Sequence, residues 1–312
     1  MEIILNKGQN TNYNHEKSNR FGKTLLLMIF LQTIHTNSGL SVGNDVNFAS
    51  DTVGLYDKDQ FKVDWNTSEP SSQSSHFMIN TDPQNTNQKV LNVTCLANQV
   101  GGGAGMAFIG PLGGQADYLN LQYDITFPEN IDFGKGGKMP GLTSEPDSPS
   151  GCIDNDSFDG FSARFMWRAD EAPAGQALLQ GYIYNPEKIE DCGDYYSSNP
   201  PYYIEGGQSY TILQQVYLGD PGISNGYILA WANGTPFLNI SNIMLRRSPD
   251  IHVDAIHMSL FYGGSDAEEW APKTDQHIAL TNFTVSSPTE NDMKSNPLDV
   301  ATTQYLRKRQ SA

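Results

Sequence analysis

The segment Phe-Ser-Ala-Arg-Phe-Met-Trp-Arg, residues 161–168, alternates in the way of a β-strand that is buried on one side. Successive side chains of a strand point to opposite faces of its sheet. One face would carry Phe161, Ala163, Phe165 and Trp167, and the other Ser162, Arg164, Met166 and Arg168. The sequence Gly-Tyr-Ile-Tyr-Asn, residues 181–185, predicts a second strand in which Tyr182 and Tyr184 share a face. One sheet surface would therefore present a serine, an arginine and two phenols.

A glycine-rich run precedes these strands, with the sequence Gly-Lys-Gly-Gly-Lys-Met-Pro-Gly-Leu at 134–142. Glycine allows backbone conformations that are closed to other residues and lets a ligand approach closely. Lys138 could therefore stand beside the arginine and the phenols, a set that suits an anionic ligand and proton transfer at a carbon next to a carboxylate. On the residues of the run alone, a glycine-rich hairpin with solvated lysines is the favoured interpretation.

The runs GKGGKMPGL, FSARFMWR and YIY together resemble polysaccharide lyase family 14, which includes alginate and glucuronan lyases. The segment FYGGSDAEEWAPKTDQHIALTNFTV, residues 261–285, is similar to the C-terminal part of that family, so the resemblance spans about 90–285. It implies a β-jelly roll and eliminative cleavage of uronic-acid polymers. It also implies active-site roles for Lys138, Ser162, Arg164, Tyr182 and Tyr184.

Other parts of the chain repeat the strand pattern. Residues 117–127 place Leu119, Leu121, Tyr123, Ile125 and Phe127 on one face, which predicts a half-buried strand. Further strands are expected between Gly, Pro and Asn turns, at 55–65, 90–96, 210–218, 226–232, 252–262 and 277–285. The pattern predicts an all-β chain with little helix, a single jelly roll of two antiparallel sheets at 45–288 that form a concave substrate groove. Residues 1–38 are expected to be a leader, and 289–312 a disordered tail.

The charge balance limits the partners. The chain has 19 basic and 35 acidic residues, a formal net charge of -16, which argues against a nucleic-acid binder. A polyanionic substrate would need a locally basic groove, for which the candidates are Lys135, Lys138, Arg164 and Arg168. We assign substrate binding to Lys135, Arg168 and Asp266; the loop 262–266 that carries Asp266 is otherwise a plain turn. We expect a monomer that binds an anionic polysaccharide.

The three cysteines are Cys95, Cys152 and Cys192, and an odd count leaves one thiol unpaired in a secreted protein. Because Cys152 and Cys192 both flank the expected site, we pair them in a disulfide; three buried free thiols are the alternative. The sequence has no Cys-x-x-Cys pair, and its histidines lack metal-ligand spacing. The acidic loop 154–159 misses the spacing of an EF-hand. We therefore expect no metal and no cofactor.

The N-terminal region carries an apolar segment at 24–34 that follows Arg20 and Lys23. This segment is too short to span a bilayer and, with the small residues after it, is typical of a secretory signal. A wrongly assigned start codon and a short membrane anchor are the alternatives. Six Asn-x-Ser/Thr sequons favour secretion and glycosylation, at Asn66, Asn92, Asn155, Asn233, Asn239 and Asn282. We expect a secreted glycoprotein without stable membrane insertion.

Eliminative cleavage removes the C5 proton of a uronate and expels the oxygen on C4. Arg164 could hold the carboxylate with two hydrogen bonds while Lys138, expected to stay an ammonium, supplies a second charge. Ser162 could donate a further hydrogen bond. The proton transfer would then fall to Tyr182 and Tyr184, whose pKa the neighbouring cations should lower; stacking on sugar is the alternative role.

Two other function classes compete with this interpretation. A glycoside hydrolase needs two carboxylates across the scissile bond, and the two site strands offer none. A non-catalytic jelly-roll lectin could bind acidic glycans through an aromatic and basic groove. Only elimination would create a new conjugated double bond.

Overall fold

The computed structural model describes residues 45–67, 76–82, 85–288 and 303–305, all within the compact unit 39–312. The predicted leader and signal peptide lie outside the described residues. The predicted tail lies outside them as well, except for the strand β16 (Thr303–Tyr305). Within the described part of the chain, no helix is long and apolar enough to cross a membrane.

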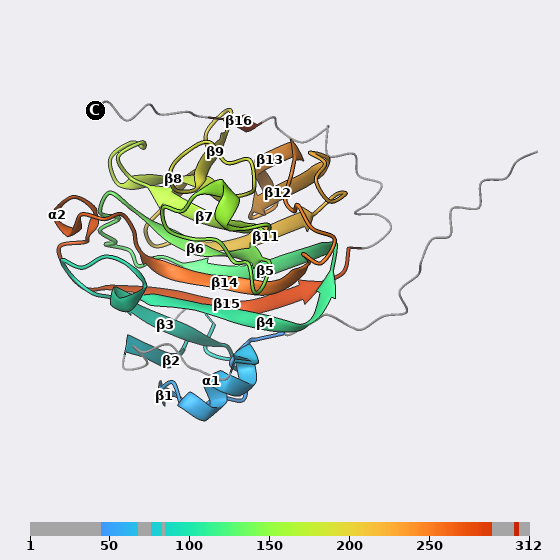
Figure 1. Ribbon diagram of the computed structural model, residues 1–312. Helices are drawn as coiled ribbons and strands as arrows, with labels where there is room; N and C mark the ends of the chain where they lie inside the picture. The colour runs from blue at the N-terminus through green and yellow to red at the C-terminus, as the bar shows by residue number, and fades with distance from the viewer. Residues whose placement is uncertain (1–44, 68–75, 83–84, 289–302, 306–312) are drawn as a thin grey trace, which may run out of the picture. The chain divides into compact units, whose positions relative to one another are not determined.

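Two antiparallel sheets make up the described unit (Figure 1). In spatial order, the first sheet contains β1 (Gly54–Leu55), β2 (Phe77–Thr81), β3 (Lys89–Cys95), β15 (Gln276–Ser286), β5 (Tyr118–Thr126), β11 (Ser209–Tyr217), β12 (Gly226–Ala232) and β13 (Thr235–Ile243). The second contains β16, β9 (Asp194–Ser198), β8 (Gln176–Tyr184), β7 (Ser162–Arg168), β6 (Gly136–Thr143), β14 (Val253–Tyr262) and β4 (Met106–Ala116), and β10 (Tyr203–Glu205) pairs with β8. This architecture confirms the predicted all-β jelly roll.

The hydrophobic core uses the faces that the alternation predicts. Phe161, Ala163, Phe165 and Trp167 are fully buried, as are Leu119, Leu121, Tyr123 and Ile125. The Phe165 ring packs 5.3 Å from that of Phe237 on β13, and the Trp167 ring packs 5.8 Å from that of Phe127. Because the apolar side of β7 faces the first sheet, its polar side must face outward.

Strand β6 contains most of the glycine-rich run, so the hairpin interpretation is wrong for this segment. Gly137 and Gly141 give the reason: a Cβ would lie 2.0 Å from the Trp167 ring at the first and 1.9 Å from the Ala163 carbonyl oxygen at the second. Glycine is required here for close packing in the sheet rather than for a turn. Gln214 of β11, in the first sheet, holds β6 in place, because its Oε1 accepts a hydrogen bond from the Leu142 amide at 2.8 Å.

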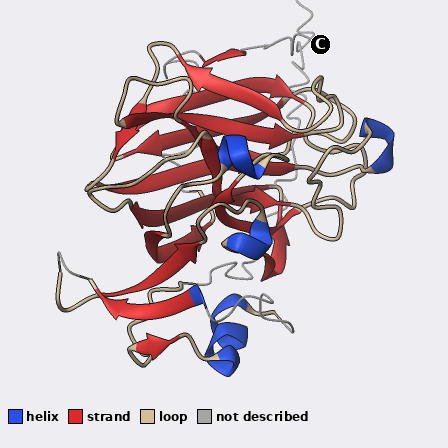
Figure 2. Ribbon diagram, turned by 90° about the vertical axis from the view of Figure 1, so that its left-hand side faces the viewer, coloured by secondary structure: helices blue, strands red, loops and turns tan. Residues whose placement is uncertain are grey.

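The helices lie at the surface beside the strands (Figure 2). They are α1 (Lys58–Trp65), α2 (Ala267–Trp270) and the short 3-10 turns η2 (Gly102–Ala104) and η3 (Asn155–Ser157). The strand predicted at 55–65 is wrong beyond Leu55. Asp57 caps α1 by accepting hydrogen bonds from the Asp59 and Gln60 amides. Helical spacing then buries Phe61 and Trp65 together and leaves Val63 74% exposed, whereas a strand would have put all three on one face.

Candidate active site

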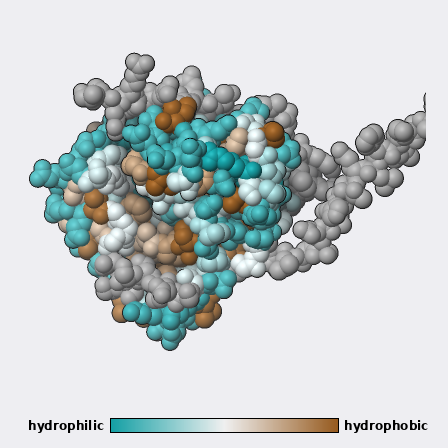
Figure 3. All heavy atoms as spheres, in the orientation of Figure 1, coloured by the Kyte–Doolittle hydropathy of each residue, from teal (hydrophilic) through white to brown (hydrophobic). Residues whose placement is uncertain are grey.

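The outward faces of β6, β7 and β8 bring the predicted residues together. In the antiparallel register Lys138 pairs with Met166, Arg164 with Tyr182, and Ser162 with Tyr184. Met166, Tyr182 and Tyr184 form a small buried cluster of their own, separate from the main core. Figure 3 shows this side of the molecule as mainly hydrophilic, with a paler hollow near its middle.

A directed chain of hydrogen bonds runs through the two phenols. The Gly193 amide donates to the Tyr182 hydroxyl at 3.2 Å, and the Tyr184 hydroxyl donates to the Gly151 carbonyl oxygen at 2.7 Å. The two hydroxyl oxygens lie 2.9 Å apart. Because a carbonyl can only accept, the single proton of Tyr184 is used at Gly151, and Tyr182 must be the donor between the phenols.

Lys138 lies over one of these phenols. Its Nζ is 4.1 Å from the centre of the Tyr182 ring and 3.6 Å from the Met166 sulfur, which accepts hydrogen bonds only weakly. Among the described residues no carboxylate pairs with this half-buried amine. Burial first, and then the charges of Arg164 and Arg168, lower the pKa of Lys138 well below its usual value. Without substrate, the surroundings of Lys138 therefore disfavour the ammonium form, which we expected beside a substrate carboxylate.

Arg164 lies deeper than its predicted role as a carboxylate clamp suggests. The side chain is only 2% exposed, and its guanidinium carbon lies 5.3 Å from each of the Tyr182 and Tyr184 rings. Nη1 donates to the Ser259 hydroxyl at 3.4 Å, while Nε and Nη2 have no hydrogen-bond partner within the described part of the chain. The cation therefore stands behind the phenols. Burial and the neighbouring Tyr182 nevertheless raise the pKa of Tyr184, opposite to the direction we expected.

Ser162 is fully buried, and its hydroxyl donates to the Pro149 carbonyl oxygen at 2.7 Å. In this geometry it anchors the loop after β6 instead of offering a proton to a ligand. Sequence reasoning missed His257 and Ser259 of β14, which stand behind Arg164. His257 Nδ1 lies 2.9 Å from the Ser148 hydroxyl, and burial lowers the pKa of this histidine. Their separation by two residues on a predicted strand was the available signal.

The two cations among the predicted substrate-binding residues lie near the end of β7 at Arg168, and both are already paired with carboxylates. Arg168 makes two 2.9 Å hydrogen bonds to Asp170 and a 3.2 Å ion pair with Glu171. Lys135 pairs with Glu269. Both cations also approach the Trp270 ring, at 5.0 Å for Arg168 and 4.9 Å for Lys135. Asp266 is exposed and caps α2 by accepting from the Glu268 amide at 2.8 Å.

Cys152 and Cys192 form a disulfide, and Cys95 is a buried free thiol. Four of the six sequon asparagines donate their side-chain amides to other protein groups, namely Asn66, Asn155, Asn233 and Asn282. Glycosylation of the sequons stays a prediction.

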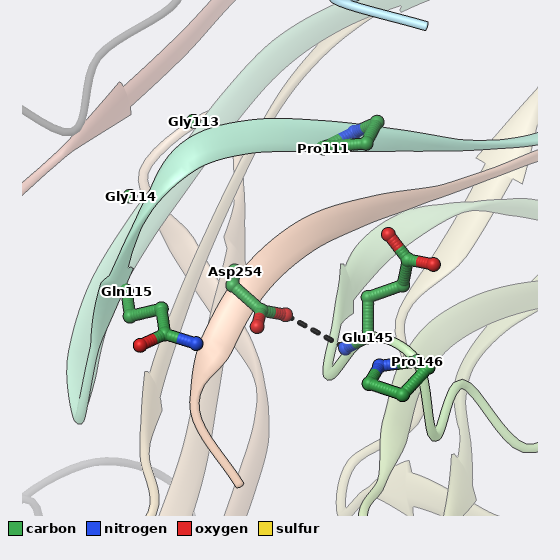
Figure 4. Close-up of a pocket in the computed structure, with 7 residues that line it drawn as sticks. All are labelled: Pro111, Gly113, Gly114, Gln115, Glu145, Pro146 and Asp254. Atoms are coloured by element: carbon green, nitrogen blue, oxygen red, sulfur yellow. Dashed lines mark hydrogen bonds between the residues drawn. The ribbon is translucent and has the colours of Figure 1, made fainter. Parts of the chain in front are cut away.

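A carboxylate-lined depression of about 380 Å³ lies apart from these residues, between β4, β14 and the Glu145–Pro146 loop (Figure 4). Burial raises the pKa of Asp254 to about 6, and its carboxylate accepts a hydrogen bond from the Glu145 amide at 2.7 Å. Since Glu145 is exposed and no aromatic side chain lines the depression, it gives little support to the hydrolase alternative.

Comparison with known proteins gives a family and a fold. Residues 83–283 match the family model Polysaccharide lyase 14. The alginate lyase Aly36B superposes with a TM-score of 0.68 at 22% identity, covering 80% of this chain and 98% of that one. The PL-14 alginate lyase from Aplysia kurodai gives 0.56 at 22%, covering 69% and 88%. The alginate lyase vAL-1 from Chlorella virus gives 0.53 at 18%, covering 68% and 89%. No curated protein matches the sequence.

Proposed function

The chain belongs to polysaccharide lyase family 14, and from this premise we propose that it cleaves glucuronan or mannuronate-rich alginate by β-elimination. The family makes it a polysaccharide lyase; the choice of polymer is our inference. Alginate lyases share the fold, and one of them, Aly36B, has been solved with an alginate tetrasaccharide in a form that has a lysine and a tyrosine replaced by alanine. These are the residue types to which we assign proton transfer.

One observation carries the proposal: a buried arginine, a lysine amine and a pair of phenols converge without a carboxylate. Lys138 and Arg164 have no acidic partner among the described residues, although the chain carries a net charge of -16. An acidic protein that leaves positive charge uncompensated at one place offers that place to an anion. A hydrolase would need carboxylates there instead.

Lys138 is the base that the geometry supports best. It is the partly exposed member of the group, while Tyr182 and Tyr184 are 3% and 1% exposed. A lowered pKa raises the share of free amine at a given pH, whereas a phenol of raised pKa, as at Tyr184, is less often ionised. We therefore assign removal of the C5 proton to Lys138, replacing our expectation that the phenols do it. The positive field of Arg164 would stabilise the enolate-like charge that develops.

Tyr182 is then the acid that protonates the leaving C4 oxygen. It is the donor within the phenol pair, and the Lys138 amine lies over its ring. After donation its phenolate would keep the hydrogen bond from the Gly193 amide, and Arg164 lies 5.3 Å from its ring. In glucuronate and mannuronate the C5 hydrogen and C4 oxygen lie on the same side of the ring, so neighbouring base and acid groups can serve both. In guluronate they do not, which is why we propose the first two.

We further propose that the protein is secreted. The support is the signal-like segment at 24–34, the sequons and the Cys152–Cys192 disulfide, since disulfides persist in oxidising compartments. Culture-medium and cell fractions, compared by immunoblot with and without removal of N-glycans, test this. Protein retained in cells without glycan would contradict it.

The test of activity is incubation of the purified protein with polyglucuronate, polymannuronate and polyguluronate, with ultraviolet absorbance and reducing ends recorded together. We expect both signals to rise on one or both of the first two polymers. Reducing ends without the conjugated double bond would indicate hydrolysis. Binding without either signal would indicate a lectin, and both outcomes would overturn the proposal.

A further inference from the structure

Two loops meet beside the phenols, and the Cys152–Cys192 disulfide joins them. The first loop, 144–161, connects β6 to β7, and the second, 185–193, connects β8 to β9. Cys152 is exposed and Cys192 half-buried, so small reductants can reach the bond, whereas Cys95 is 1% exposed. Among the described residues, the disulfide therefore holds the cysteine sulfurs that a reductant can reach.

The two backbone groups that hold the phenol hydroxyls are covalent neighbours of these cysteines. Gly151, whose carbonyl accepts from Tyr184, precedes Cys152; Gly193, whose amide donates to Tyr182, follows Cys192. The hydrogen-bond chain therefore begins on one loop and ends on the other. The disulfide connects its two ends and closes the arrangement into a ring.

Both positions favour glycine, for different reasons. A Cβ on Gly193 would lie 2.7 Å from the Tyr184 ring and 2.8 Å from the Tyr182 ring, so only glycine lets the amide come this close to the phenols. Gly151 has a φ of +76°, in the region that favours glycine. The loops thus bring bare backbone against the phenols, and small loop movements would change both terminal hydrogen bonds.

We propose that the Cys152–Cys192 disulfide is a positioning element of the active site, which fixes the Gly193 amide and the Gly151 carbonyl so that the Tyr182 hydroxyl is held ready to donate its proton. This inference rests on the acid role proposed for Tyr182. Reduction by a dithiol would break the S–S bond and give two cysteine thiols, while the dithiol loses two electrons and two protons and closes to its own disulfide. Activity then becomes sensitive to reductants although the reaction itself uses no cysteine.

The test compares the oxidised full-length protein with the same protein treated with a dithiol under native conditions. Thiol titration without denaturant should rise by two groups, since Cys95 is buried. We expect kcat to fall about tenfold, a modest part of what misplacing a catalytic group can cost, with KM changed less than about twofold. Hydrogen exchange of the peptide that contains Gly193 should become about tenfold faster, and reoxidation should restore both quantities.

Two variants separate positioning from a merely structural role. The double variant Cys152→Ser with Cys192→Ser should reproduce the reduced protein and no longer respond to dithiol. The matched control is Asn155→Ala, which removes the 2.7 Å hydrogen bond from Asn155 Nδ2 to the Lys188 carbonyl between the same two loops, away from the phenols. It should lower the melting temperature yet keep kcat within about twofold of the wild type, as expected for a change that leaves the reacting groups in place.

The outcomes distinguish this inference from the proposed function. Unchanged kcat in folded protein with two titrated thiols would overturn the positioning role, as would an equal loss of kcat in Asn155→Ala. If the oxidised protein cleaves none of the polymers, the proposed function fails, and exchange at Gly193 still decides whether the disulfide holds the phenol pair. Unaltered exchange after reduction would then overturn the inference by itself.

Discussion

The polar side of β7 carries the same kind of charge in two opposite settings. Arg164, near the start of the strand, and Lys138, opposite Met166 on β6, are buried or half-buried without any acidic partner among the described residues. At the other end Arg168 is held by Asp170 and Glu171, and Lys135 by Glu269. An uncompensated buried cation is costly, and a paired one much less so. The positive charge without an acidic partner can bind an anion, whereas the paired cations are already neutralised by carboxylates.

This contrast also assigns roles. Cations that already have carboxylate partners hold local structure, here Trp270 and the start of the loop after β7. Burial lowers the pKa of Lys138, and the charges of Arg164 and Arg168 lower it further; Arg164, which has no acidic partner among the described residues, also supplies the field in which charge can develop. If the contrast is functional, substitutions at the uncompensated end should affect turnover far more than substitutions at the compensated end.

The largest effect is expected at Lys138. Lys138→Met keeps most of the length of the side chain and removes the base. The kcat should therefore fall roughly hundredfold to ten-thousandfold, which is what a positioned base contributes. The melting temperature should stay equal or rise, because the variant no longer buries an unpaired amine. Initial rates on the preferred polymer and a thermal melt check both points; turnover within tenfold of the wild type would remove Lys138 from the chemistry.

The two phenols should differ from each other. Tyr182→Phe removes the proposed acid and should lower kcat on the order of a hundredfold. Tyr184→Phe removes only the group between Tyr182 and Gly151, and about a tenfold loss is expected, as for one lost hydrogen bond. Parallel kinetics of the two variants test the order. A stronger loss in Tyr184→Phe would reverse our assignment, and near-full turnover in both would make the pair a stacking surface.

Arg164→Lys should have an intermediate effect. The guanidinium touches both phenol rings and Ser259 at once, which an ammonium cannot do. Losing one charge-assisted contact costs roughly 1.5–3 kcal/mol, about ten- to a hundredfold in rate. Steady-state rates on protein shown to be folded by circular dichroism check this; a fully active variant would mean that the position needs only a positive charge.

The smallest effect is expected at the compensated end. Glu269→Gln frees the Lys135 ammonium, so KM should fall about twofold at low salt, and the gain should disappear as salt screens the charge. The kcat should hardly change. Rates measured over a salt series check this, and a large loss of kcat would show that the paired end takes part in the reaction.

Alternation predicted the all-β fold and the shared faces of the residues on β7 and β8, whereas the place of Lys138 and the site roles came from the family resemblance. The period of two at 117–127 and 161–168 sorts side chains by face without knowledge of distant contacts, and the structure keeps those faces. At 55–65 the same reasoning failed, because Phe61 and Trp65 fit a strand and a helix alike, and the Asp57 cap decided between them.

The state of the site residues could not be predicted. It depends on partners far away in the sequence, such as Pro149 for Ser162, Ser259 for Arg164 and Glu269 for Lys135. The depth of Arg164 behind the phenols and the loss of solvent around Lys138 are packing effects. Burial raises the pKa of Tyr184, which we expected to be lowered, and it lowers the pKa of Lys138. Only the acidic partners of Arg168 stood nearby in the sequence, at 170 and 171.

The central claim, that Lys138 acts as a neutral amine at an uncompensated site, is tested most directly by the pH dependence of kcat/KM. This quantity reports the ionisation of the free enzyme. The base must be unprotonated, and the pKa of Lys138 lies well below its usual 10.5, so kcat/KM should rise with pH to a plateau that begins well below 10.5 and be lost as pH falls through the lowered pKa. A rising limb centred at or above about 10, where an unperturbed lysine or tyrosine ionises, would contradict the account.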